Sequence, residues 1–165
     1  MTSDNVYPVK SNYSGELPIP GIVKVFYYND SDSKNQLNEW LKANSNVRCI
    51  VVTNLTNETD ESINGLVDEY PRSIWFISNS YNWEEQEYNI TSSVSPQDNN
   101  RDGGVIVRIP SYKEFGQGAV VEVYDDSMEI SGLKIKNSDG NVLETPYLIP
   151  LGHYCIPTES NKYVE

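Results

Sequence analysis

This 165-residue sequence has no long apolar run, only 1 histidine and no closely spaced cysteines. No apolar stretch reaches the roughly 18 residues of a membrane-spanning helix, so we expect no membrane span. The chain has 1 histidine and 2 cysteines, and neither Cys49 nor Cys155 belongs to a CxxC pair. Structural zinc sites need several such ligands close together, so none is expected. Cys49 lies in the apolar run 47-VRCIVVT-53 and is interpreted as a buried thiol, with a disulfide left open.

Basic residues are also scarce, because 12 Lys and Arg stand against 24 Asp and Glu, giving a formal net charge of −12. Such a chain repels phosphate backbones, and we expect no nucleic-acid partner. The first residues, 1-MTSDNVYPVK-10, contain no apolar segment of the kind that a secretory signal has. We therefore expect a cytoplasmic or virion-associated protein.

The first half of the chain alternates between strand-like and helix-like segments. Apolar, β-branched segments predict strands, and amphipathic segments predict helices between them. The predicted strands are 22–28, 47–53 and 73–78, and the predicted helices are 31–43 and the segment between Thr59 and Pro71. The β-α-β-α-β order predicts an α/β fold whose core is a three-stranded parallel sheet with right-handed crossovers.

The second half has no helical periodicity. Residues 84–103 are polar and acidic and predict a mobile loop. Turn signals separate four further predicted strands, which we expect to be antiparallel: 104–110, 118–125, 127–136 and 142–150. The turn 137–141 predicts a hairpin, and the alternation of Val121 and Val123 with Glu122 and Tyr124 predicts one solvated face.

The expected organisation is an N-terminal arm or linker, residues 1–20, then a single α/β domain, residues 21–156, and a C-terminal tail, residues 157–165. The arm is polar and carries three prolines. One edge strand within the arm is compatible with its sequence, although prolines limit how much of a ladder it can form.

Several motifs follow one another in a particular order. A helix contains 36-QLNEWL-41, a strand ends in Val52-Thr53-Asn54, and 70-YP-71 precedes a strand that closes on 78-SNSY-81. The segments 120-VVEVYDDSMEISGLKI-135 and 146-PYLIPL-151 then complete the chain. In order and spacing, residues 21–151 resemble the C-terminal half of a calcineurin-like metallophosphoesterase, which ends in antiparallel strands.

In the family that the chain resembles, histidines at these strand ends hold a two-metal centre. The matching positions here are Asn54, Asn79 and Tyr81. An amide nitrogen has no free lone pair, and a tyrosine keeps its proton to a pH of about 10. The family's N-terminal half has no counterpart, and His153 lies beyond the last predicted strand. The resemblance therefore implies a scaffold without metal, cofactor or catalysis.

Three aromatic residues, Tyr81, Trp83 and Tyr88, follow the third predicted strand in a polar segment. Large aromatic side chains in such loops are enriched at protein interfaces. The alternative is that they fold over the end of the sheet and complete the core, and the sequence leaves both interpretations open.

Together these features predict a non-catalytic structural or interaction module on a degenerate phosphoesterase-like scaffold, such as a viral or phage assembly component. A truncated sheet leaves an edge and a face that need cover, which favours a homo-oligomer or a larger protein assembly. The alternative is a phosphate- or nucleotide-binding, phosphoesterase-derived enzyme fragment. It would use Asn54, Asn79 and Tyr81 as hydrogen-bonding groups.

Overall fold

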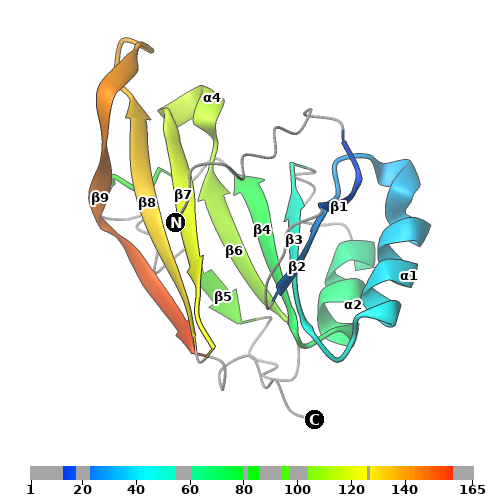
Figure 1. Cartoon of the computed structure of the whole chain (residues 1–165). Coiled ribbons are helices and arrows are strands. Elements are labelled where there is room, and N and C mark those ends of the chain that lie inside the picture. Colours follow the sequence, from blue (N-terminus) through cyan, green and yellow to red (C-terminus); the bar gives the residue numbers. More distant parts are fainter. Residues whose placement is uncertain are drawn as a thin grey trace.

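Two β-sheets and two longer helices form the part of the protein that the computed structural model describes, which comprises residues 13–17, 23–54, 61–79, 82–85, 94–96, 104–125 and 127–157. Sheet A has six strands in the order β1-β2-β3-β4-β6-β5, and sheet B has three in the order β7-β8-β9 (Figure 1). The fold is therefore mixed α/β, with a mixed sheet and a separate antiparallel sheet.

The element bounds follow the predicted segments closely in the first half of the chain. The strands are β1 Gly15–Leu17, β2 Val23–Tyr27, β3 Arg48–Thr53, β4 Ser73–Asn79, β5 Val94–Pro96, β6 Val105–Pro110, β7 Gln117–Val123, β8 Ser127–Lys136 and β9 Val142–Pro157. The helices are α1 Lys34–Ala43, α2 Glu61–Glu69 and α4 Tyr112–Phe115, and a 3-10 turn, η1, spans Ser31–Ser33.

The predicted parallel unit is present, since β2 pairs with β3 and β3 pairs with β4 in parallel. The prediction that all later strands are antiparallel is wrong for β6, which pairs in parallel with β4. A parallel neighbour needs a connection of roughly a dozen residues or more, and the segment between β4 and β6 provides it. Within that segment, predicted as a loop, β5 pairs antiparallel with β6; the loop's other residues lie mostly outside the described ranges.

Sheet A ends in a short antiparallel strand at each edge, β1 beside β2 and β5 beside β6. Short edge strands of this kind limit pairing with other chains. Strand β1 belongs to the predicted arm, so part of that arm is a strand of the sheet. It is held by the Glu16 carboxylate, which accepts a hydrogen bond from Trp40 Nε1 at 2.6 Å, and by Ser14 Oγ, which accepts from the backbone of Asn29 at 2.9 Å.

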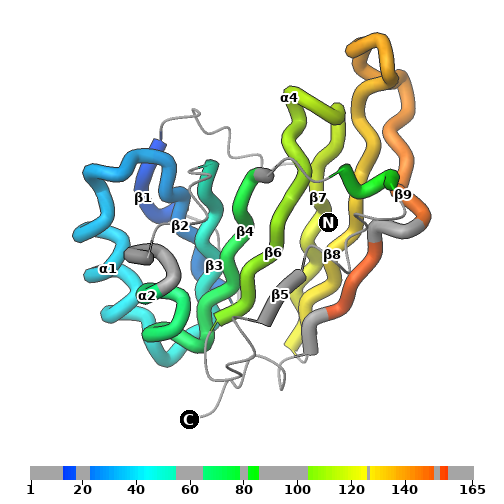
Figure 2. The backbone as a smooth tube through the Cα atoms, turned by 180° about the vertical axis from the view of Figure 1, so that it is seen from behind, coloured from blue at the N-terminus to red at the C-terminus, as the bar shows by residue number. Residues whose placement is uncertain are grey.

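Helices α1 and α2 cover one face of sheet A (Figures 1 and 2). Their apolar stripes, which include Leu37, Leu41 and Val67, pack on Val51 and Trp75 of the sheet. The burial of these side chains stabilises the layer by about 25 cal/mol for each Å² of apolar surface removed from water. The apolar residues that recur along each helix in the sequence are thus the ones that face the sheet.

Sheet B covers part of the opposite face of sheet A, so the protein has three layers (Figure 1). Met128 and Ile130 of β8 are fully buried in one cluster with Ile74 and Val107 of sheet A. This second core explains why the strands of sheet A are apolar on both sides, as expected for parallel strands covered on both faces.

Strand β9 is longer than predicted, and it includes His153, which pairs with Ser131. The prediction that His153 lies beyond the sheet is therefore wrong. Near Pro150 the ladder contains a bulge, since Leu148 pairs with Leu133 and His153 pairs with Ser131, which leaves extra residues on β9. The pairing resumes after the bulge, so the strand continues past Pro150. Proline is tolerated at such bulges because it has no N–H to donate.

The predicted hairpin between β8 and β9 is confirmed. The N–H of Asn137 donates to the carbonyl of Asn141 at 2.9 Å, and Gly140 takes a φ of 83° in the turn. Among the described residues, no helix has both the length and the apolar character needed to cross a membrane.

Candidate functional site

The carboxyl ends of β3 and β4 carry the residues that match the metal positions of the resembled family. Asn54 is exposed directly after β3, and its backbone N–H donates to Asn29 Oδ1 at 2.8 Å. Asn79 is the last residue of β4, in register with Pro110. The side chain of Asn79, as well as Tyr81 and Tyr88, lies outside the described residues. The structure therefore brings Asn54 to Asn29 and leaves its relation to the other predicted site residues untested.

No metal centre is formed by the residues that the structure describes, because they contain no group of 3 or more His, Cys, Asp and Glu side chains placed to hold an ion. Both cysteines are free; Cys49 is buried and Cys155 is exposed on β9. Burial raises the pKa of the Cys49 thiol to about 12, which makes it unreactive near neutral pH.

Trp83 is fully buried. Its burial supports the interpretation that this aromatic residue completes the core and does not form an interface. Its indole N–H donates to the carbonyl of Arg108 at 3.1 Å, and its backbone N–H donates to Gln117 Oε1 at 3.0 Å. Gln117 is itself fully buried. Both N–H groups of this buried tryptophan thus have acceptors, as buried donors require.

The same network continues to Glu84, which joins the segment after β4 to sheet B. The Gln117 amide donates to Glu84 Oε1 at 3.1 Å, and Lys134 Nζ lies 2.6 Å from the same oxygen. Burial by itself raises the pKa of Glu84, but hydrogen bonds from Lys134, Gln117 and Tyr147 outweigh it and hold the pKa below its usual value. These contacts fasten the segment after β4 to β7 and β8 of sheet B.

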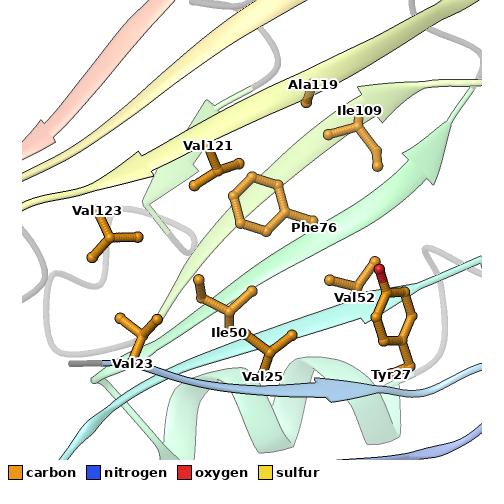
Figure 3. Close-up of a pocket in the computed structure, with 10 residues that line it drawn as sticks. All are labelled: Val23, Val25, Tyr27, Ile50, Val52, Phe76, Ile109, Ala119, Val121 and Val123. Atoms are coloured by element: carbon orange, nitrogen blue, oxygen red, sulfur yellow. The ribbon is translucent and has the colours of Figure 1, made fainter. Parts of the chain in front are cut away.

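A groove opens between the two sheets where sheet B stops covering sheet A. It has a volume of about 370 Å³ and is lined by side chains from β2, β3, β4, β6 and β7 (Figure 3). The lining residues are Val23, Val25, Tyr27, Ile50, Val52, Phe76, Ile109, Ala119, Val121 and Val123. Apart from the hydroxyl of Tyr27, every one of these side chains is apolar.

On the sheet A side, the lining of the groove is more exposed toward the carboxyl ends of the strands. Val25 and Ile50, in the middle of their strands, are buried, whereas Tyr27 and Val52, nearer the carboxyl ends, are half-buried. Ile109, close to the end of β6, is also half-buried. The mouth therefore lies toward the carboxyl edge of sheet A, where open α/β sheets usually bind ligands.

The outer face of sheet B is the second surface with unusual chemistry. We define it by the side chains that point away from sheet A: Val120, Glu122, Tyr124, Glu129, Ser131, Leu133, Leu148 and His153. Leu148 is 62% exposed and lies opposite Leu133, while Val120 is 38% exposed on β7. The predicted solvated face of the strand that holds Val121 and Val123 is confirmed, and it carries apolar as well as charged side chains.

Two carboxylates stand directly opposite each other on this outer face, since Glu122 pairs with Glu129 in the β7–β8 ladder. Like charges in that arrangement destabilise a sheet. Within the described part of the chain neither carboxylate has a cationic partner; Glu122 accepts a hydrogen bond from the Tyr124 hydroxyl at 3.0 Å. That hydrogen bond and the neighbouring charges raise the pKa of Tyr124.

A histidine and a serine also meet on the outer face, where Ser131 Oγ lies 3.2 Å from His153 Nδ1. Both residues are at the surface, and the groove is on the other side of sheet B. Nothing there would exclude water or orient a substrate, so the pair has no feature of a nucleophilic site beyond the one hydrogen bond.

Sequence reasoning missed the groove because it depends on how far one sheet extends over another. The strands that line the groove were predicted, but their apolar residues were expected to be part of the hydrophobic core. The alternation of apolar and polar residues in β7 predicted the outer face. The opposition of Glu122 and Glu129 could not be predicted, because it depends on the strand register, which no local pattern specifies.

No protein-family model matches the chain, and neither a curated protein nor a solved structure matches it. What the fold and its surfaces define is a three-layer mixed α/β protein with an apolar groove between its sheets and an acidic, partly apolar outer face. Any statement of its function rests on those surfaces.

Proposed function

We propose that the protein is a non-catalytic interaction module that docks into a larger protein assembly through the outer face of sheet B. The observation that carries this proposal is the combination of exposed Leu148 and Val120 with the opposed carboxylates of Glu122 and Glu129. Such a surface favours a partner that covers the exposed apolar side chains and neutralises the negative charge of the two carboxylates.

The partner that fits this face presents basic and apolar side chains together. A Lys or Arg placed between Glu122 and Glu129 would relieve their repulsion, and apolar side chains would cover Leu148 and Leu133. A second copy fits less well, because it would bring the same acidic face, on a chain with a net charge of −12, against itself. Of the two expected arrangements, we therefore favour an assembly with a different protein over a homo-oligomer.

The non-catalytic part of the proposal has separate support. Among the described residues near these strand ends, Asn29 accepts from Asn54, and Gln117 and Glu84 are engaged with Trp83 and Lys134. The scaffold keeps the strand–helix order and the closing antiparallel strands that resemble a phosphoesterase C-terminal half. We propose that it derives from such a half and has lost the metal chemistry.

The test uses a synthetic peptide of alternating leucine and lysine as a stand-in for the partner surface. In an NMR titration of the isotope-labelled protein, we expect amide shifts that saturate and are confined to β7, β8 and the facing part of β9. A matched peptide of alternating leucine and glutamate is expected to cause none. Equal shifts with both peptides, or shifts confined to the helices, would overturn the proposal.

A further inference from the structure

The groove between the sheets has the form of a small-molecule site, and it lies on the other side of sheet B from the proposed docking face. We infer that it binds a small neutral amphipathic molecule, one with a hydrocarbon body and a single hydrogen-bonding head group such as a hydroxyl. The inference does not depend on the proposed function, because different residues form the two surfaces.

The size of the groove suits such a molecule. Ligand pockets range from about 300 to 1,000 Å³, and this groove, at about 370 Å³, lies at the lower end of that range. Its volume corresponds to roughly a dozen water molecules at their share of liquid volume. A hydrocarbon chain of medium length fills such a space, whereas a helix does not fit.

The lining selects for a hydrocarbon body. Ile50 and Phe76 form the floor from sheet A, and Ala119 and Val121 form the opposite wall from β7 (Figure 3). Water in the groove meets aliphatic and aromatic carbon on both sides, with one hydroxyl to bond to. Its replacement by an apolar ligand is favourable for the same reason that folding buries such side chains.

Tyr27 provides the one polar contact. Its hydroxyl lies beside Val52 on the groove side of sheet A (Figure 3). Within the described part of the chain, this hydroxyl makes no hydrogen bond. Burial raises the pKa of this phenol, so it stays protonated near neutral pH and can both donate and accept. Because Tyr27 is half-buried near the mouth, a head group bonded to it stays next to water while the body lies inside.

The absence of charge from the lining favours a neutral head group. No lining residue is basic. Arg48, which pairs with the lining residue Val23, donates to the carbonyls of Tyr124 and Ser127. A carboxylate would therefore enter an acidic protein without a counter-ion, whereas a hydroxyl needs only the phenol. We expect a fatty alcohol to bind more tightly than the fatty acid of the same length.

The experiment is a methyl NMR titration of the wild-type protein with n-decanol and, separately, with decanoate. We expect decanol to shift the methyl signals of Ile50, Val52 and Ile109 in a saturable way, with decanoate at least several-fold weaker. Tyr27→Phe, which removes only the hydroxyl, is expected to weaken decanol binding by about two- to tenfold, the range for one lost hydrogen bond.

Two substitutions on neighbouring residues of β7 locate the site. Ala119→Phe adds a ring on the groove side and is expected to abolish decanol binding, while Val120→Phe adds the same ring on the outer face and leaves it unchanged. If Ala119→Phe does not fold, the wild-type methyl shifts still decide. Shifts of the β7 backbone amides without shifts of the lining methyl groups would place decanol outside the groove, and this outcome, like non-saturating shifts, overturns the inference.

The two proposals can fail separately. Glu122 belongs to the docking face and does not line the groove. Glu122→Lys is therefore expected to leave decanol binding unchanged. Loss of decanol binding in Ala119→Phe with intact peptide binding assigns the groove alone. A protein that binds the leucine–lysine peptide but not decanol keeps the proposed function and rejects the ligand site.

Discussion

Single polar side chains in the core determine how the two layers of this protein are joined. Gln117 is fully buried, and it accepts from Trp83 while it donates to Asn82 and Glu84. A side chain with this many partners cannot be replaced by an apolar one of similar size without leaving buried groups unpaired, and that penalty exceeds the value of an average hydrogen bond.

Gln117→Leu is therefore expected to destabilise the protein by about 1–3 kcal/mol, the cost of buried polar groups left without partners. The matched control is Gln36→Leu on α1, where the side chain is exposed and the expected change is within about 0.5 kcal/mol. Urea unfolding of the two variants measures both values. An equal effect at the two positions would show that the network contributes nothing specific.

The carboxylate of Glu84 links stability to pH. Its pKa is below the usual value in the folded state because of Lys134, Gln117 and Tyr147, so its contribution is present above the unfolded-state pKa and is lost as the pH falls through the folded one. We expect Glu84→Gln to lower the melting temperature at neutral pH and the difference from wild type to shrink below roughly pH 4.3. A difference that stays constant down to acid pH would contradict this assignment.

At the scale of elements, the sequence specified the segments better than their partners. Helices α1 and α2 and strands β2, β3, β4, β6, β7 and β8 were predicted because apolar periodicity is a local property. The short helix α4 was not predicted, since the second half of the sequence has no helical periodicity. The pairing of β6 with β4 was not, because a strand's neighbours depend on the whole chain. Similarly, Asn54 was proposed as a site residue from a resemblance in the local sequence and stays a prediction, while the groove and the opposition of Glu122 and Glu129 required the register of two sheets.

Two glycines give opposite predictions about local structure. Gly140 has a φ of 83° in the β8–β9 turn, so Gly140→Ala is expected to cost about 1–2 kcal/mol although no atom lies near enough to clash. Gly65 lies within α2 with open space around it, so Gly65→Ala is expected to stabilise the protein by about 0.5–1 kcal/mol. Changes of the same sign in urea unfolding would show that the conformation of the turn is not as described.

At the scale of the whole molecule, sheet A is covered from within the chain. Helices α1 and α2 pack on one face, sheet B packs on much of the other, and β1 and β5 close the edges. The expectation that a truncated sheet needs a partner for cover therefore loses its basis for sheet A. The case for an assembly rests on the outer face of sheet B. Within the described residues, the groove is a place where sheet B leaves sheet A uncovered.

The proposed loss of metal chemistry predicts that the purified protein does not hydrolyse phosphomonoesters or phosphodiesters in the presence of Mn²⁺. The reason is the identity of the residues at the matching positions, Asn54, Asn79 and Tyr81, none of which offers an imidazole nitrogen. A chromogenic phosphate ester provides the measurement. Turnover above the buffer blank that disappears with a chelator would contradict the proposal.

The central claim is that the opposed carboxylates on the outer face of sheet B recognise a basic and apolar partner. The measurement is the affinity of the leucine–lysine peptide for wild type, for Glu122→Lys and for Glu39→Lys, which makes the same change of charge on exposed α1. We predict that Glu122→Lys weakens binding at least tenfold, that Glu39→Lys changes it little, and that added salt weakens the wild-type complex. Equal losses in both variants would mean that only net charge attracts the peptide and would contradict the claim.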